Sequence, residues 1–232
     1  MDFMKKEKLP LDCVRQISGN TGYCFVFLEP DGERTFLTYK GCETEYSDDL
    51  TADNAVNSCS VAAVTGYYLL DDSSKKLIGR LKALKTTGCK IVFDPSPLAG
   101  KIDAAYLKEM LGLSDVLTPN RAEAEFLARI AGNEPPEQWA ISCSEKGAAV
   151  IIKNGAAGGA LYESGKKTHY AAVSVNVVDT TGAGDSFTGA IAYALGEGIP
   201  LAKGVKLAAA AAGHTVSIKG PHGEFDIGVL RC

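Results

Sequence analysis

The 232-residue chain has little that would attach it to nucleic acid or to a membrane. Its net charge of −4 includes no basic block, which argues against nucleic acid and against an anionic membrane as partners. The residues that follow Met1 lack the apolar segment of a signal peptide, and no apolar run approaches the length of a membrane span. We therefore expect neither a nucleic-acid partner nor a membrane partner.

Disulfide and metal-binding patterns are also missing from the sequence. The seven cysteines include no Cys-x-x-Cys pair, and the three histidines show no ligand spacing with cysteines or carboxylates. An odd number of cysteines, several of them within apolar segments, indicates reduced thiols. This pattern predicts a cytoplasmic protein.

Residues 59–232 alternate between strand and helix patterns. Short apolar runs predict strands, and amphipathic or alanine-rich segments predict helices between them. The predicted strands are residues 61–66, 90–93, 115–118, 148–153, 160–162, 169–173 and the run that contains Val175, Val177 and Val178; the predicted helices are residues 73–84, 102–113, 120–131, 183–195 and 201–216. Such alternation predicts an α/β fold, with a mainly parallel sheet flanked by helices on both faces, as the core in residues 59–232.

Residues 1–58 have a different pattern. Residues 23–29 and 34–39 are β-branched and aromatic and are joined by Pro30-Asp31-Gly32, which predicts a β-hairpin. A two-stranded ribbon is only marginally stable alone, so it should lie over another part of the protein or pair with a second copy. We expect residues 1–58 to form a small β unit separate from the core.

Residues 179–187, Asp-Thr-Thr-Gly-Ala-Gly-Asp-Ser-Phe, carry the strongest chemical signal. They lead into an alanine-rich helix, so the N–H groups of Gly182, Ala183 and Gly184 should lie at the positive end of its dipole and form an anion pocket. A carboxylate beside this pocket, Asp185, makes sense if it takes a proton from an attacking hydroxyl during phosphoryl transfer. The alternative is a tight turn shaped by the glycines and a helix capped by Asp185. No Gly-Lys-Ser/Thr follows the glycines, so this is not a Walker A loop.

Other polar residues and glycines fall at the carboxyl ends of the predicted strands. They are Asp94, Asn120 and residues 153–155, together with residues 179–185. In sheets of this kind, ligands bind outside the carboxyl ends of the strands. The sequence therefore predicts four loops around one crevice.

Glu123 lies one helical turn after Asn120, so both side chains can face this crevice. An amide and a carboxylate there could hold a water-clad Mg²⁺ near phosphate oxygens, because Mg²⁺ prefers oxygen ligands and keeps several waters. The alternative is an ordinary N-cap with an acidic residue in the first helical turn.

The 179–187 string and the Asn120-x-x-Glu123 pair together resemble two motifs of the ribokinase-like (PfkB-type) carbohydrate kinases, and the resemblance covers nearly the whole chain. It implies the ribokinase-like fold and an ATP-dependent, Mg²⁺-assisted kinase that transfers the γ-phosphate to a hydroxyl of a sugar or sugar-like molecule. In such an enzyme Asp185 would be the catalytic base. The hairpin with residues 31–35 resembles the family's lid, through which a homodimer could form.

The same resemblance implies further ligand segments. Lys153, Asn154, Gly155 and Gly158 occupy the place of the family's nucleotide loop, with Ala156 where a polar residue is usual, and Asn120 would also contact the nucleotide. The segments that contain Asp179, Thr181 and Gly220 look like those whose backbone oxygens bind a monovalent cation such as K⁺ in several members.

The sequence also departs from the family pattern at its front. Members usually begin with a strand that carries a sugar-binding Asp, followed by a Gly-Gly-x-x-x-Asn helix start, and neither occurs here. Residues 1–13 resemble the end of a later helix, so we expect an N-terminal segment to be absent. A truncated, non-catalytic nucleotide-binding or interaction protein therefore remains an alternative, as does a nucleoside acceptor. A dinucleotide-binding oxidoreductase is disfavoured, because its glycine motif would follow the first strand.

Overall fold

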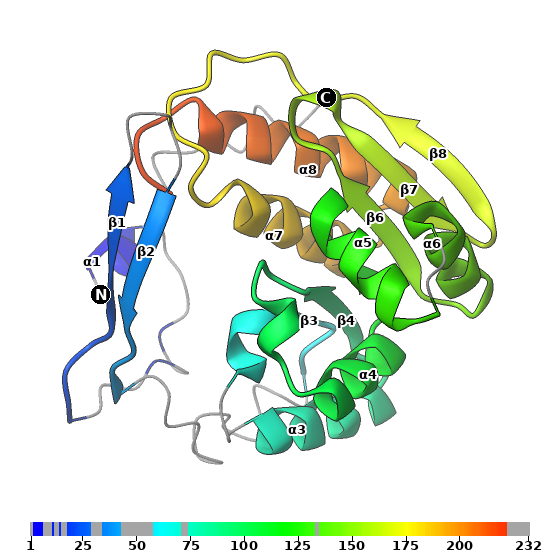
Figure 1. Cartoon of the computed structure of the whole chain (residues 1–232), viewed down its shortest axis with the longest axis horizontal. Helices are drawn as coiled ribbons and strands as arrows, with labels where there is room; N and C mark the ends of the chain where they lie inside the picture. Colours follow the sequence, from blue (N-terminus) through cyan, green and yellow to red (C-terminus); the bar gives the residue numbers. More distant parts are fainter. Residues whose placement is uncertain are drawn as a thin grey trace.

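A computed structural model describes residues 2–6, 11, 14, 18–28, 34–42, 58–70, 74–132 and 135–221 of the chain. These residues form one six-stranded sheet covered by helices and one separate two-stranded hairpin (Figure 1). The predicted α/β class with a small β unit is confirmed. None of the described helices has the length and apolar character that crossing a bilayer would require.

The large sheet has the strand order β3-β4-β5-β6-β7-β8. Its strands are β3 (Val61–Thr65), β4 (Lys90–Asp94), β5 (Val116–Leu117), β6 (Ala149–Lys153), β7 (Gly159–Glu163) and β8 (Lys166–Tyr170). The pairs from β3 to β6 are parallel, and β7 and β8 add an antiparallel edge. The carboxyl ends of β3, β4, β5 and β6 therefore lie along one edge of the sheet, where the sequence places its polar loops.

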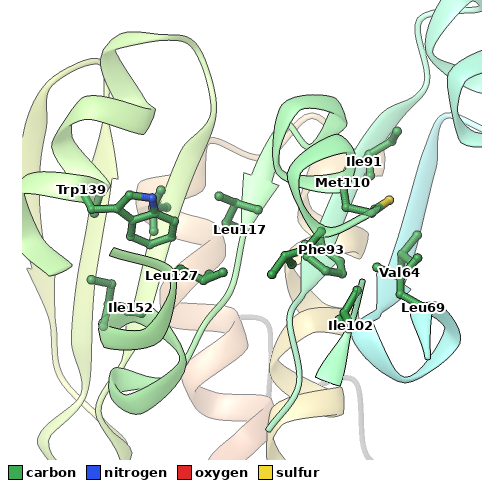
Figure 2. Close-up of a cluster of buried hydrophobic side chains, with 14 of the residues drawn as sticks. Val64, Leu69, Ile91, Phe93, Ile102, Met110, Leu117, Leu127, Trp139 and Ile152 are labelled. Atoms are coloured by element: carbon green, nitrogen blue, oxygen red, sulfur yellow. The ribbon is translucent and has the colours of Figure 1, made fainter. Parts of the chain in front are cut away.

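Helices cover both faces of this sheet because the strand side chains alternate between two apolar clusters. One cluster contains Ile91 and Phe93 and is covered by α3 (Ser74–Thr86), α4 (Ala104–Leu113), α5 (Arg121–Ile130) and α6 (Pro136–Glu145), as Figure 2 shows for part of it. The other contains Val92 and is covered by α7 (Ala183–Gly196) and α8 (Leu201–Val216). Val92 and Phe93 are both fully buried, so this strand is apolar on both faces.

The hairpin consists of β1 (Tyr23–Leu28) and β2 (Arg34–Tyr39), paired antiparallel with Tyr23 opposite Tyr39. It stands apart from the six-stranded sheet, on the side of the short helix α1 (Asp2–Lys6) (Figure 1). The rings of Tyr23 and Tyr39 stack at 5.1 Å. Phe25 and Phe36 are 56% and 59% exposed, so apolar side chains face solvent from both strands. The predicted turn at Asp31 and Gly32 lies outside the described residues.

Two sequence predictions need correction. The run Val175 to Val178 forms no strand; instead the N–H groups of Val178 and Asp179 donate to the carbonyl of Val216 at 2.7 and 3.2 Å, beside the end of α8. The run is apolar, but it bonds to a helix end and not to a neighbouring strand. The predicted strand 169–173 also ends early, because β8 stops at Tyr170.

The segment after Ala131 contains a helix that the sequence analysis did not assign. The helix is α6, which begins with Pro136 in its first turn. A proline is favourable there because its missing N–H would have no partner at a helix start. Short 3₁₀ helices also occur, at Gly66–Leu69 (η3), Ala99–Lys101 (η4) and Gly155–Ala157 (η5).

Candidate active site

The carboxyl ends of β4, β5 and β6 meet the first turns of α7 at one place, and Asp94 lies at its centre. Asp94 ends β4, and its Oδ2 accepts hydrogen bonds from Lys153 Nζ at 2.7 Å, Thr188 Oγ1 at 3.0 Å and Thr118 Oγ1 at 3.4 Å. Its Oδ1 accepts a hydrogen bond from the N–H of Ser96 at 3.1 Å. Three elements of the sheet edge and one helix are thereby joined through a single carboxylate.

Parallel pairing explains why these residues meet. Phe93 pairs with Leu117 and Leu117 with Val150, so the residues that follow each strand emerge side by side. A further bridge joins Asn120 to Lys153, and the N–H of Lys153 donates to the carbonyl of Pro119 at 2.9 Å. The hydroxyl oxygens of Thr118 and Thr188 also lie 3.0 Å apart, within hydrogen-bond distance. The sequence analysis assigned no role to either threonine, and only the tertiary structure identifies them.

The predicted anion pocket lies at the start of α7, where Gly182 is the N-cap residue with φ 79°. A side chain there would be strained, and a Cβ would lie 2.8 Å from the carbonyl oxygen of Pro221. The N–H of Ala183 points toward the carbonyl of Thr180 at a long 3.4 Å, while Gly184 and Asp185 follow in the first turn. The glycine-rich turn and the helix start that the sequence predicted are both present.

Asp185 is exposed at this helix start, next to the Asp94 group. The surrounding protein raises the pKa of Asp185, first by partial desolvation and then by the negative charge of Asp94; the ammonium of Lys153 acts in the opposite direction. A carboxyl with a raised pKa in a crevice is suited to accept a proton.

Asn120 and Glu123 form a reciprocal capping box at the start of α5. Asn120 Oδ1 accepts the N–H of Glu123 at 2.9 Å, and Glu123 Oε2 accepts the N–H of Asn120 at 2.8 Å. Asn120 Nδ2 also donates to Glu123 Oε1 at 2.7 Å. Glu123 is only 6% exposed, and its pKa is raised, chiefly by burial. The N-cap alternative is therefore present in the structure, in the same place as the predicted ligand pair.

Tyr67 is a crevice residue that the sequence analysis missed. It follows β3 in η3, and it is nearly half exposed. Its pKa is raised by partial burial and then by the negative charges of Asp185 and Glu123. Asp94 contributes in the same direction, and Cys24 of β1 does so more weakly.

The predicted nucleotide loop follows β6 and turns back tightly into β7. The N–H of Asn154 donates to the carbonyl of Gly158 at 2.8 Å, and Gly155 and Gly158 both have positive φ. A Cβ on Gly158 would lie 2.1 Å from the carbonyl oxygen of Tyr170, so a glycine is required there. Asn154 and Gly155 are exposed, and Lys153 at the start of the loop points into the Asp94 group.

The segments predicted to bind a monovalent cation are also brought together. Asp179 Oδ1 accepts the N–H of Thr181 at 2.9 Å, and its Oδ2 accepts the N–H of Gly220 at 3.2 Å. The Asp179 carboxylate thus ties the turn before α7 to the turn after α8. This arrangement fixes the backbone on both sides, whether or not a cation binds there.

Comparison with known proteins agrees with this geometry. The family described as pfkB family carbohydrate kinase matches residues 1–225. An uncharacterized sugar kinase of Escherichia coli, YegV, is 33% identical over 219 residues, which are 94% of this chain and 67% of that protein. A ribokinase of Arabidopsis thaliana is 31% identical over 221 residues, 90% of this chain and 56% of that protein.

Comparison of the fold with solved structures agrees with the comparison of sequences. A structure from Escherichia coli described as a ribokinase II, in complex with ATP and Mg²⁺, superposes with a TM-score of 0.76 and 25% identity. The match covers 86% of this chain and 66% of that one. The chain thus spans between about half and two thirds of the length of these relatives. By sequence and by fold, the chain belongs to the pfkB family of carbohydrate kinases.

Proposed function

We propose that the protein is an ATP-dependent kinase that transfers the γ-phosphate to a hydroxyl of a sugar or sugar-like small molecule. The observation that carries this proposal is Asp185 in the first turn of α7, beside the glycine-rich turn and within reach of the charges of Asp94 and Lys153. The relatives named sugar kinase and ribokinase support a sugar as acceptor, and the complex of the ribokinase II with ATP and Mg²⁺ supports the donor.

The start of α7 would supply both the base and the N–H groups that stabilise the transferred phosphate. Asp185 takes the proton of an acceptor hydroxyl, whose oxygen forms a bond to the γ-phosphorus while the bond from that phosphorus to the β,γ-bridging oxygen breaks and ADP leaves. The N–H groups of Gly182, Ala183 and Gly184 lie at the positive end of the α7 dipole, where charge on the transferred group is stabilised. Asn120, Lys153, Asn154, Gly155 and Gly158 would hold the nucleotide.

The residues present fit a magnesium ion bound through water. Both carboxylate oxygens of Glu123 already accept bonds from Asn120, so a direct bond would have to displace one of them. A carboxylate oxygen can accept a second hydrogen bond, and Mg²⁺ keeps several of its waters. Asn120 and Glu123 would therefore hold the ion through its water shell, and the ion would offset phosphate charge. A monovalent cation, K⁺, would use backbone oxygens near Asp179, Thr181 and Gly220.

The hairpin is proposed as a lid over the acceptor and as the contact of a homodimer. Its exposed side chains include Tyr23, Phe25, Phe27, Phe36, Leu37 and Tyr39. An apolar ribbon with unpaired edges is covered in stable proteins, and a second copy of the same ribbon would cover it symmetrically. We propose that residues 1–58 form one unit and residues 59–232 another, because the hairpin is not part of the six-stranded sheet. A cytoplasmic location is also proposed, since none of the five described cysteines forms a disulfide.

One experiment separates this function from a non-catalytic nucleotide-binding protein. ATP binding is measured by calorimetry with Mg²⁺, and phosphoryl transfer is measured against a panel of sugars and nucleosides. We expect ATP binding, with transfer to a sugar in preference to a nucleoside. ATP binding without transfer to any acceptor would favour the non-catalytic protein, and transfer to nucleosides alone would identify a nucleoside kinase. Failure to bind ATP would overturn the proposal.

A further inference from the structure

Lys153 is held in a fixed position at the edge of the sheet where β4, β5 and β6 end. Its Nζ donates to Asp94 Oδ2 at 2.7 Å, and the side chains of both residues are only 15% exposed. Its own backbone is fixed as well, through the bond to Pro119 and the bridge to Asn120. An ion pair with so little exposure orders the lysine side chain far more than a surface pair would.

Asp94 is built to hold this lysine in one direction. Three other donors, the N–H of Ser96 and the hydroxyls of Thr118 and Thr188, bond the same carboxylate and come from three different segments. The carboxylate therefore cannot turn to follow the lysine. The ammonium of Lys153 therefore lies on the side of the Asp94 carboxylate that faces α7.

The ammonium of Lys153 is also directly beside the predicted anion pocket. A Cβ placed on Gly184 would lie 3.6 Å from Lys153 Nζ and 4.0 Å from Asp94 Oδ2. Gly184 belongs to the first turn of α7, so the Lys153 ammonium lies next to the positive end of that helix dipole. Among the described residues, Asp94 is the one acceptor bonded to Nζ, which leaves the ammonium further N–H donors for a ligand.

The negative charge of the carboxylates near Lys153 favours a cation at this place. The negative charge of Asp94 raises the pKa of both Glu123 and Asp185, and a triphosphate is itself strongly anionic. Lys153 lowers the pKa of both Glu123 and Asp185, so its charge reaches both sides of the site. Gly184, the residue of α7 next to Lys153 Nζ, has no side chain and therefore supplies no charge at this place.

We propose that Lys153 binds the terminal phosphate of a nucleoside triphosphate, and that Asp94 is the positioning residue that aims Lys153 at it. This inference rests on the proposed kinase function and specifies which part of the nucleotide meets the lysine. It assigns to Asp94 no contact with the nucleotide. Lys153 therefore distinguishes a triphosphate from a diphosphate, which a lysine that merely neutralises Asp94 would not do.

The test compares two nucleotides by calorimetry in the presence of Mg²⁺: the non-hydrolysable analogue adenosine 5′-(β,γ-imido)triphosphate, and ADP. In Lys153→Met we expect the affinity for the triphosphate analogue to fall about 10- to 100-fold, the loss of one or two charge-assisted hydrogen bonds, and the affinity for ADP to change less than about twofold. Lys166→Met, an exposed lysine on the edge strand β8, is the matched control and should change neither affinity.

Removing Lys153 alone leaves Asp94 partly buried without its cation, so the single variant could unfold. The double variant Lys153→Met with Asp94→Asn removes both charges and keeps a polar side chain for Thr118 and Thr188. It should show the same loss of triphosphate preference. Asp94→Asn alone should lower that preference by a smaller factor, and it should have no further effect when Lys153 is already methionine. Such non-additivity is the signature of a residue that acts through the lysine.

Three outcomes would overturn the inference while leaving the kinase function intact: equal losses for both nucleotides, no loss for either, or an effect of Lys153→Met confined to the KM of the acceptor. A wild-type protein that binds neither nucleotide would overturn the inference together with the proposed function. Retention of triphosphate preference in Lys153→Arg would support it, because the charge and donors remain.

Discussion

The side chain of Asn120 accepts the backbone N–H of Glu123, and the side chain of Glu123 accepts the backbone N–H of Asn120, so this pair of residues begins helix α5. A capping box accepts glutamine as well as glutamate at its second position. Glutamine at position 123 keeps an oxygen for the backbone N–H of Asn120, but it removes both the charge and the acceptor for Asn120 Nδ2.

Glu123→Gln should leave helix α5 intact and weaken the action of Mg²⁺. We expect the Mg²⁺ concentration for half-maximal rate to rise more than the KM for the acceptor, because the lost charge faces the ion and not the sugar. The measurement is the rate as a function of Mg²⁺, with thermal unfolding as a check on folding. An unchanged Mg²⁺ dependence would reduce Glu123 to a helix-start residue.

Asp185→Asn should lower kcat by roughly 10² to 10⁴, the usual contribution of a general base, while ATP affinity changes little. Steady-state kinetics with the best acceptor and calorimetry with ATP measure the two effects. Ser186 is the next residue along α7 and bonds to Thr215 at 2.7 Å, so Ser186→Ala serves as a control that disturbs the same helix turn. Near-normal turnover in Asp185→Asn would remove Asp185 from the chemistry.

The acid limb of the pH–rate profile should lie above the ordinary pKa of an aspartate. Partial desolvation and then Asp94 raise the pKa of Asp185, and a base works only when ionised, so kcat/KM falls as the pH drops through that raised value. Lys153 lowers the same pKa. Lys153→Met should therefore move the limb to higher pH, and Asp94→Asn should move it to lower pH. Shifts in one common direction would contradict this assignment of charges.

Gly66→Ala should destabilise the protein by about 1 to 3 kcal/mol, as overpacking of a tight site usually does. Gly66 is buried at the start of η3, and a Cβ there would lie 2.0 Å from the carbonyl oxygen of Pro95. Gly79→Ala is the matched control, since Gly79 lies within α3 with no atom within 4 Å of its Cβ position. The control should be neutral or stabilising by up to about 1 kcal/mol. Urea unfolding distinguishes the two, and equal stabilities would show that η3 shifts freely.

The hairpin should mediate dimer formation in solution. Phe25 and Leu37 are directly opposite each other and both exposed, so replacing both with serine should convert a dimer into a monomer as measured by light scattering. Tyr193→Ser on α7 removes a similarly exposed apolar side chain and should leave the dimer unchanged. A wild-type protein that is monomeric at high concentration would reject this role of the hairpin.

Much of the fold could be predicted because its signals are local. The apolar runs, the capping residues and the glycines of residues 179–187 specify strands, a helix start and a turn through their own side chains. The sequence pattern thus located six strands of the sheet, the hairpin pairing and both helices on the second face. It failed for residues 175–178, where Val177 and Val178 are exposed and the N–H of Val178 bonds to the end of α8 and not to a neighbouring strand.

The candidate site also has one part that could be predicted from the sequence and one part that could not. Asn120 with Glu123, and Gly182 with Asp185, lie within one helical turn of each other, so their spacing already specifies their geometry. The sequence placed Asp94 and Lys153 at one edge of the sheet, but the contacts of Asp94 could not be predicted, since Lys153 is 59 residues away in the sequence and Thr188 is 94 residues away. Those contacts exist because parallel pairing aligns three strand ends and α7 packs across them.

The local motifs, and the edge of the sheet at which they lie, follow from the amino-acid sequence alone. Which of their side chains touch depends on the tertiary structure, which brings Lys153, Thr118 and Thr188 to the carboxylate of Asp94. Local motifs follow from short-range backbone geometry, whereas these contacts depend on strand register and helix packing, which are set by the burial of the whole apolar core.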